Sequence, residues 1–272
     1  MLKQQLTVDV GSPEFRSRIY IEYSVAIESA KELVGLASKA STEKSVAESL
    51  HQVIGWTSCI VSNSLGAVVT LVLNGYGNDA MKIGRSMFEG AVNSTYLKLH
   101  PEQLKDYMDF SIIRQKRRLE FMKKHAPGEL KRIPAQKIPD TENLYNSIVH
   151  RFQNKNGKVR GSWCRVPFSR RAEEVGMGIV YNTVYTWASS LMHLDFSGLA
   201  LQSESVFGNN KEADLFCDVA PSEKWLSEAL LVGHASTLLI LDCYNKVAML
   251  GMDAEIEAAN QAFVKAWRKS PP

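Results

Sequence analysis

Apolar residues dominate one long stretch of this chain. Residues 53–73 read VIGWTSCIVSNSLGAVVTLVL and contain no charged side chain over 21 positions, the longest such run in the sequence. The run lies inside a longer helical pattern of about residues 42–74, with Ser41 as its expected N-cap. A helix that is apolar on nearly all sides must be buried, either in lipid or beneath other helices. The rest of the chain is therefore expected to supply the helices that bury it.

The polar content of this run favours protein rather than lipid around it. About 20 residues are enough to cross a bilayer, yet Asn63 lies near the centre of the run. Small residues also recur there at spacings of three or four, which lets helices approach closely: Gly55, Ser58, Cys59, Ser62 and Gly66. No cluster of Lys or Arg that would orient a membrane span flanks the run, and the mean hydropathy is −0.16. We expect a buried central helix and no membrane contact.

Helical periodicity extends over most of the chain. Apolar positions recur at helical spacing in residues 16–39, 79–100, 101–125, 141–153, 179–194, 221–250 and 253–268, with a shorter helix at 169–175. Asp140 is the expected cap of the helix at 141–153. No segment alternates apolar and polar residues between hairpin turns, as strands do. The sequence therefore predicts an all-α fold, a bundle of seven to nine helices around the central uncharged helix of about residues 42–74.

The connecting segments predict one domain. Residues 1–15 form an irregular lead-in, and residues 16–268 follow as a single all-helical domain because no linker is long or polar enough to divide them. Residues 154–166 are polar, glycine-containing and basic, which is typical of a mobile surface loop. Residues 196–220 are expected to be irregular.

Composition leaves several functional classes without support. The 272 residues are 45% hydrophobic and 22% charged, which are globular values. The four cysteines form no C-x-x-C pair of the kind found in zinc ribbons and thioredoxins, and Cys59 and Cys243 are predicted to be buried thiols. Phosphate-binding glycine loops and G-x-S-x-G elbows are absent, and no cofactor is expected. The first residues lack the apolar core of a signal peptide, which predicts a cytoplasmic location.

Positive charge is concentrated in one segment. Residues 105–171 contain 17 Lys and Arg but six Asp and Glu, a net charge of +11, whereas the whole chain carries +3. A basic surface of this size is suited to phosphates, so nucleic acid is one expected partner. The equal alternative is a face that docks on the acidic remainder of the chain or on a partner protein. The candidate binding residues in this segment are Arg114, Arg117 and Arg118.

Two polar motifs are candidates for chemistry. Arg85 and Glu89 lie one turn apart and share a helix face, although an exposed ion pair of this kind contributes little. The second motif is a stripe at intervals of four residues: Tyr181, Tyr185, Ser189 and His193. A lone histidine near a helix C-terminus is more often structural, because the helix dipole favours its charged form. Buried hydroxyls beside it raise the odds of a functional network.

Trp163 lies in the basic sequence GSWCRVPFSRR. An aromatic side chain among arginines can stack on a nucleic-acid base, which makes Trp163 a candidate binding residue. The alternative is that its ring anchors this segment on the protein core. The sequence leaves both alternatives open.

These motifs carry a resemblance to a known family. RSMFEGAVNSTYLKLHPEQLKDYMDF, WCRVPFSRRAEEVG and YNTVYTWASSLMH resemble a bacterial family catalogued as domain of unknown function DUF5677, over about residues 40–250. The matching positions are Arg85, Ser86, Glu89, Trp163, Ala172, Gly176, Tyr181, Tyr185, Ser189 and His193. The resemblance implies an all-helical fold and no established activity.

That family is similar in flavour to HEPN-type helical nucleases and abortive-infection proteins, which use an arginine and a histidine at a dimer interface. The similarity implies a homodimer and a metal-independent ribonuclease in which Arg85 holds a phosphate, His193 moves a proton and Glu89 orients Arg85. The chain departs from that pattern, because no arginine stands five to seven residues before His193. The one formal match, Arg118 with His125, lies in a basic helix where chance matches are common.

Three hypotheses follow. The preferred one is a binding module whose basic face contacts nucleic acid or a partner protein, with the polar motifs as a structural network. The alternative is a ribonuclease or abortive-infection effector that uses Arg85 and His193. A carboxylate metal site of Glu89, His193 and Asp195 ranks last, because the Glu-x-x-His pairs of diiron bundles are absent and no metal is expected.

Overall fold

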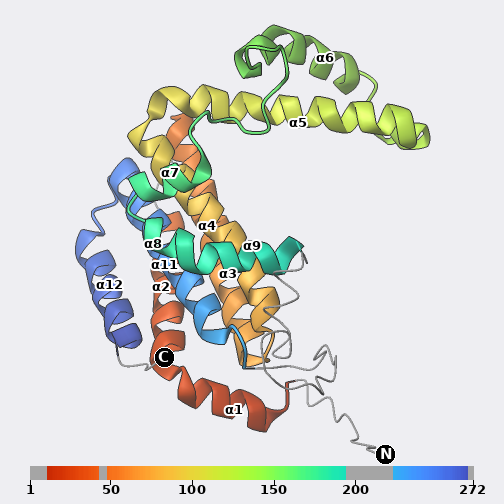
Figure 1. Ribbon diagram of the computed structural model, residues 1–272. Helices are drawn as coiled ribbons and strands as arrows, with labels where there is room; N and C mark the ends of the chain where they lie inside the picture. Colours follow the sequence, from red (N-terminus) through yellow and green to blue (C-terminus); the bar gives the residue numbers. More distant parts are fainter. Residues whose placement is uncertain (1–10, 43–47, 194–222, 269–272) are drawn as a thin grey trace, which may run out of the picture. The chain divides into compact units, whose positions relative to one another are not determined.

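The computed structural model describes residues 11–42, 48–193 and 223–268. Within these ranges the chain forms eleven α-helical segments joined by short 3-10 and π turns, and no β-strand, so the predicted all-α fold is confirmed (Figure 1). The chain divides into two compact units: unit 1 runs to Lys98 and resumes at Ser169, and unit 2 is residues 99–168. The single domain expected for residues 16–268 stays a prediction.

Unit 1 contains most of the helical elements. They are α1 (Pro13–Glu22), α2 (Ser24–Thr42), α3 (Ser49–Leu73), α4 (Gly77–Leu99), α7 (Phe168–Glu174), α8 (Gly178–Val180), the π-helical turn η4 (Tyr181–Tyr185), α9 (Thr186–His193), α11 (Leu226–Ala248) and α12 (Asp253–Arg268). The described residues of both units together form eleven α-helical segments, more than the seven to nine helices expected. One reason is that the backbone leaves helical geometry at Tyr23 and divides the helix predicted for residues 16–39.

The predicted central helix is α3, which packs against α2 and α11 (Figure 1). It begins at Ser49 rather than near residue 42, and Ser41 is not its N-cap but lies in the last turn of α2. Its end is set by Gly75, whose φ of +79° is readily adopted only by glycine. The N–H groups of Gly75 and Tyr76 bond to carbonyls of the last helical turn in a Schellman arrangement.

Burial of α3 is one-sided. Leu65 and Val68 are fully buried, whereas Trp56 and Ile60 are 65% and 68% exposed. Cys59 lies on the exposed face, so its predicted burial is wrong, although Cys243 in α11 is buried as predicted. The enclosure on all sides expected from the uncharged run is therefore wrong. Because the run has no charge, any face of the helix could be buried. Packing against the neighbouring helices decides which face is buried.

Glycines, which have no side chain, let the helices of unit 1 approach closely. A Cβ placed on Gly84 of α4 would lie 2.4 Å from Cγ1 of Val232 in α11. A Cβ on Gly90, further along α4, would lie 3.2 Å from Cγ2 of Thr57 in α3. Glycine in a helix interior is unfavourable by itself, so its presence here reflects the space between helices. The positions of α3, α4 and α11 relative to one another depend on these contacts.

Two described helices, α3 and α11, are long and apolar enough to span a bilayer by length and composition alone. Core helices of soluble proteins meet the same criterion, and 67% of the apolar window of α11 is buried within the protein, compared with 39% for α3. Absence of membrane contact and the cytoplasmic location stay predictions.

Unit 2 consists of a long helix with shorter elements before and after it. These are η1 (Pro101–Gln103), α5 (Leu104–His125), η2 (Pro127–Arg132), α6 (Lys137–Ile148) and η3 (Val149–Phe152). α6 packs on α5 (Figure 1). It begins at Lys137 rather than residue 141, so Asp140 is inside the helix and is not its cap. Pro139 is tolerated there because the N–H groups of a first helical turn have no intrahelical partner.

The segment predicted as a mobile loop, residues 154–166, begins with a hydrogen-bonded turn. Asn154 Oδ1 accepts from the backbone N–H of Asn156 at 3.0 Å and of Lys158 at 2.9 Å. The Arg160 N–H bonds to the Phe152 carbonyl at 2.8 Å. These local bonds fold the chain back on itself at a site where composition alone indicated only polarity.

The close approach at Gly84 gives a stability prediction. We expect Gly84→Ala to lower the free energy of unfolding by about 1–3 kcal/mol, because the added methyl group overpacks the contact with Val232. The matched control is Gly66→Ala in α3, where an added Cβ meets nothing within 4 Å. That change should raise stability by about 1 kcal/mol through helix propensity alone. Equal effects of the two substitutions in urea unfolding would contradict the close packing of α4.

Candidate functional site

The polar motif of α4 meets the tyrosine motif of η4 in unit 1. Arg85 Nη2 lies 3.0 Å from Glu89 Oε1. The Tyr185 hydroxyl donates to the same carboxylate oxygen at 2.7 Å and accepts from Arg85 Nη2 at 3.4 Å. The guanidinium also lies over the Tyr185 ring, 5.3 Å from its centroid. These three residues, here called the Arg85 cluster, join segments that are far apart in the sequence.

Tyr185 is held by a π-helical turn. The backbone N–H of Thr186 bonds to the carbonyl of Tyr181, five residues earlier. The rings of Tyr181 and Tyr185 stack with centroids 5.1 Å apart, and Phe88 of α4 lies 5.3 Å from the Tyr185 ring. The predicted alignment of the two tyrosines is therefore present, in a turn of a type that is often found at functional sites.

The Arg85 cluster is only partly open to solvent. The side chain of Arg85 is 16% exposed and that of Glu89 is 41% exposed. Burial and the hydrogen bond to Glu89 raise the pKa of Tyr185 to about 12, so the hydroxyl stays protonated and remains a donor at neutral pH. Arg85 Nε is buried without a hydrogen-bond partner among the described residues. Because Glu89 already occupies Nη2, a phosphate that used both terminal nitrogens of Arg85 would have to displace this carboxylate.

His193 has no hydrogen bond or ion pair to this cluster among the described residues. It is the last residue of α9 and its side chain is exposed. The preceding residue, Met192, contacts the cluster, with Sδ 2.8 Å from Arg85 Nη1. Within the described ranges, neither the His193 nor the Ser189 side chain has a hydrogen bond or ion pair. The structure brings Arg85 and Glu89 together with Tyr185, and no hydrogen bond or ion pair among the described residues joins His193 to them.

A buried arginine that the sequence pattern did not predict packs on α4. Arg171 of α7 is 5% exposed, donates to Asn93 Oδ1 and has its guanidinium carbon 6.0 Å from the centroid of the Tyr96 ring. Asn93 and Tyr96 belong to α4. The signal for this contact was weak, because Arg171 lies in a run of charged residues that is typical of an exposed helix.

Ala172 and Gly176, two of the positions that match the family, have a structural role at the end of α7. Gly176 has a φ of +79° and follows the end of α7. Its N–H bonds to the Glu173 carbonyl at 3.0 Å, and the Met177 N–H bonds to the Ala172 carbonyl at 2.7 Å. This is a Schellman ending, which requires a residue with positive φ at that position. The glycine therefore ends one helix and directs the chain into α8 and η4.

A buried histidine of unit 1 is His234 rather than His193. His234 is 1% exposed in α11, with Nε2 3.4 Å from Ser29 Oγ and its ring 4.6 Å from that of Phe263. Burial lowers its pKa to about 4, so the imidazole is neutral at neutral pH. Its apolar sequence context, LLVGHASTLLIL, was the available signal for a core position.

Trp163 is buried in unit 2. Its side chain is 5% exposed, and its ring meets that of Tyr107 edge-on, with centroids 5.2 Å apart and planes at 88°. The next residue, Cys164, is also buried, with Sγ 3.2 Å from Gln103 Oε1. This geometry matches the anchoring alternative, because a base has no exposed ring face on which to stack.

The carboxylates of unit 2 are all engaged inside the unit. Residues 99–168, which are described throughout, contain 15 Lys and Arg and seven Asp and Glu, a net charge of +8. Lys116 and Lys123 both bind Glu120 and Glu142, which ties α6 to α5. Further ion pairs use Arg151 with Asp106 and Asp109, Lys105 with Asp109, and Arg132 with Glu129. Glu102 Oε1 lies 3.5 Å from His100 Nδ1, and Gln136 donates to Asp140.

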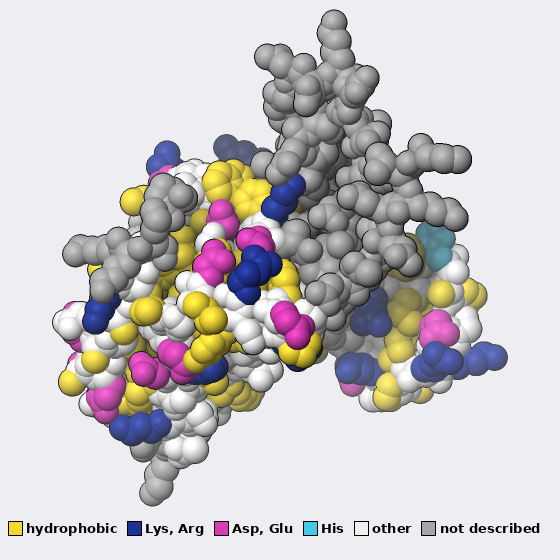
Figure 2. All heavy atoms as spheres, turned by 90° about the horizontal axis from the view of Figure 1, so that it is seen from below, with side chains coloured by type: hydrophobic (Ala, Val, Ile, Leu, Met, Phe, Trp, Pro, Cys, Tyr) yellow, Lys and Arg dark blue, Asp and Glu magenta, His cyan; other side chains and the backbone are white. Residues whose placement is uncertain are grey.

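Ten cations of unit 2 are consequently left without a carboxylate partner in this described part of the chain. They are Arg114, Arg117, Arg118, Lys124, Lys131, Lys137, Lys155, Lys158, Arg160 and Arg165. Arg117 instead donates to the carbonyl of Arg160 at 2.8 Å, and Arg114 lies over the Phe110 ring at 5.5 Å. In contrast, acidic and basic side chains are interspersed with apolar ones on the face of unit 1 drawn in Figure 2.

The metal site of Glu89, His193 and Asp195 stays a prediction because Asp195 lies outside the described residues. Among those that are described, no three His, Cys, Asp or Glu side chains are grouped to hold a metal ion.

A double-mutant cycle measures the hydrogen bond within the Arg85 cluster. We expect Tyr185→Phe and Glu89→Gln to be coupled by about 0.5–1.5 kcal/mol in the free energy of unfolding, since either change weakens the same bond. Urea denaturation of both single variants and the double variant measures this coupling. Strictly additive effects would show that the two side chains do not interact in solution.

Comparison with known proteins supports the resemblance carried by these motifs. The model of the Family of unknown function (DUF5677) matches residues 53–210, more than half of the chain. The matched segment contains most of α3 and all of α4, unit 2 and the Arg85 cluster. No curated protein and no solved structure matches this chain. The similarity to HEPN-type proteins stays a prediction. The chain belongs to the family of unknown function DUF5677.

Proposed function

We propose that this protein is a nucleic-acid-binding module that uses the basic surface of unit 2. The observation that supports this proposal is the set of ten cations without a carboxylate partner in residues 99–168. Internal ion pairs hold the unit together, and most of the remaining cations are available to an external anion. Arg160 is the exception, because its Nε and Nη1 are buried and its Nη2 donates to the Arg151 carbonyl. Release of counterions from a nucleic-acid backbone then supplies the binding free energy.

The distribution of these cations favours an extended polyanion. They come from α5, from η2, from the first residue of α6 and from residues 155–165, so they are spread over several elements of the unit. The buried Trp163 removes the expected stacking platform. We therefore infer backbone recognition with little sequence preference, because phosphate contacts fix position and carry no base information.

Salt-dependent binding of a single-stranded RNA tests this proposal. We expect a dissociation constant of about 10⁻⁴–10⁻⁶ M that weakens steeply between about 50 and 200 mM salt. The variant Arg114→Gln/Lys124→Gln/Lys131→Gln should bind more weakly, and its log–log salt slope should be shallower by about 0.7 for each phosphate that it no longer neutralises. Fluorescence anisotropy of a labelled oligonucleotide measures both quantities.

The control removes the same charge from unit 1. Lys31→Gln/Lys39→Gln/Lys246→Gln changes three exposed lysines whose partners are carboxylates of unit 1. RNA affinity should be unchanged in this variant if unit 2 is the binding surface. Equal weakening by both triple variants, or no RNA binding by the wild type at low salt, would count against the proposal and in favour of a partner protein.

A second candidate function is a metal-independent ribonuclease centred on the Arg85 cluster. The observation in its favour is the contact between Arg85 and Met192, because His193 is the residue that follows Met192. In this proposal RNA displaces Glu89 from Arg85, the guanidinium binds the phosphate and His193 transfers a proton. The cost of breaking the Arg85–Glu89 pair makes this candidate the weaker one.

Cleavage assays in the presence of a metal chelator test the second candidate. If it is correct, a labelled RNA is cut by the wild type and cleavage falls by about 100-fold or more in both Arg85→Ala and His193→Ala. His150→Ala is the control because His150 is another exposed histidine, lies in η3 and belongs to neither Arg–His motif. Cleavage that persists at the wild-type rate in both cluster variants would rule out the mechanism.

A further inference from the structure

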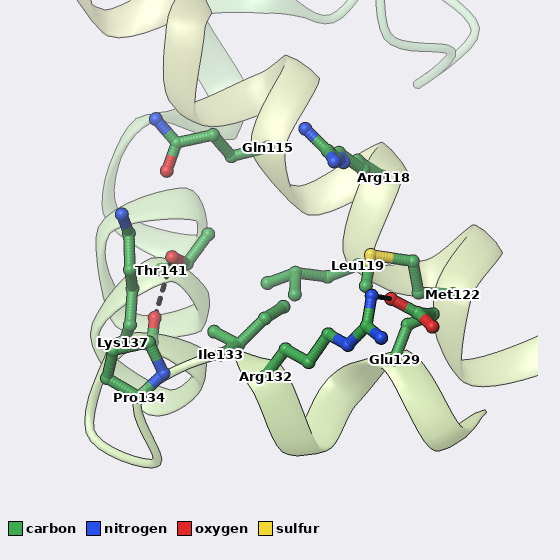
Figure 3. Close-up of a pocket in the computed structure, with 10 residues that line it drawn as sticks. All are labelled: Gln115, Arg118, Leu119, Met122, Glu129, Arg132, Ile133, Pro134, Lys137 and Thr141. Atoms are coloured by element: carbon green, nitrogen blue, oxygen red, sulfur yellow. Dashed lines mark hydrogen bonds and ion pairs between the residues drawn. The ribbon is translucent and has the colours of Figure 1, made fainter. Parts of the chain in front are cut away.

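A pocket of about 440 Å³ lies inside unit 2, between α5, η2 and the first turns of α6. Its volume falls within the roughly 300–1,000 Å³ that small-molecule sites occupy. Figure 3 shows Lys137 on one side of the open centre and Arg118 on the other, with Gln115 beside them at the same end. Two elements of the unit thus present cations to one space.

Both of these cations are available to a ligand. Neither the Arg118 guanidinium nor the Lys137 ammonium has a hydrogen bond or ion pair to another residue of unit 2. The carboxylate in the lining is that of Glu129, which Arg132 binds at 3.0 Å. The lining therefore carries a net charge of +2, concentrated at the end of the pocket away from the Arg132–Glu129 pair (Figure 3).

The rest of the pocket suits a flat apolar group. Leu119, Met122, Ile133 and Pro134 form its apolar wall. Thr141 Oγ1 donates to the Lys137 carbonyl at 2.8 Å, so the hydroxyl oxygen can only accept from a ligand. Gln115 adds a side-chain amide, which both donates and accepts. An anionic end and an apolar end with hydrogen-bonding groups between them describe the ligand that such a lining would take.

We propose that this pocket binds a nucleotide through its phosphate monoester, either free or at the 5′ end of a strand. Arg118 and Lys137 hold the phosphate, since a planar guanidinium matches two phosphate oxygens and an ammonium adds a point charge. The base lies against Leu119 and Ile133, and Gln115 contacts its edge or the sugar. Binding of the 5′ end of a strand rests on the proposed nucleic-acid binding, whereas binding of a free nucleotide does not.

The experiment compares three probes on the full-length chain. They are an oligonucleotide with a 5′ phosphate, the same oligonucleotide with a 5′ hydroxyl, and adenosine monophosphate. We expect the 5′ phosphate to strengthen wild-type binding by about tenfold or more at physiological salt, as one charge-assisted contact does. Arg118→Gln/Lys137→Gln should abolish this difference. Arg114→Gln/Lys124→Gln, which removes equal charge outside the pocket lining, should preserve it.

The outcomes separate this inference from the proposed function. Strong binding of both oligonucleotides with no phosphate dependence, and no binding of adenosine monophosphate, overturns the pocket and leaves the basic surface intact. Binding of adenosine monophosphate that disappears in Arg118→Gln/Lys137→Gln supports the pocket even if no oligonucleotide binds. A phosphate effect that disappears equally in both double variants overturns the pocket, because it then reflects surface charge alone. Matching thermal unfolding of all variants verifies that they are folded.

Discussion

Close packing of α4 against α11 at Gly84 is the constraint that sets the direction of the polar residues on α4. Gly84 leaves no room for a side chain between the two helices, since an added Cβ would lie 2.4 Å from Val232. Arg85 is the next residue, and consecutive helical positions point about 100° apart around the axis. The residue that faces α11 therefore fixes the direction in which Arg85 leaves α4. The ion pair with Glu89 and the contact with Tyr185 follow from that direction.

The Arg85 cluster illustrates how one geometry can serve stability or chemistry. Its guanidinium is partly buried and already paired, so binding of a phosphate there requires the loss of an existing interaction. Burial and the hydrogen bond to Glu89 raise the pKa of Tyr185, so its hydroxyl remains the donor in this contact. Networks of this kind are costly to disrupt once buried. The arrangement therefore favours a structural role for the Arg85 cluster, in which it holds η4 against α4.

Unit 2 is stabilised differently, because its carboxylates form ion pairs and hydrogen bonds within the unit. Glu120 and Glu142 bind Lys116 and Lys123 and so hold α6 on α5. The surplus cations then have no carboxylate partner within the unit, and Arg118 and Lys137 line a pocket that this same packing of α6 on α5 creates. The ion pairs that stabilise the unit therefore use only some of its lysines and arginines. The remaining lysines and arginines give the surface its positive charge.

The sequence by itself determined the helical class, most helix positions and the concentration of positive charge, because apolar periodicity and composition are local properties. It also placed Arg85 with Glu89 and Tyr181 with Tyr185, since each pair is separated by one helical turn. Tertiary structure alone decided that these pairs meet, that Trp163 is buried, that Trp56 and Ile60 are exposed on α3, and that Arg171 is a core residue. Each of these depends on which helix faces are in contact, and such contacts between distant segments leave no periodic signal in a single chain.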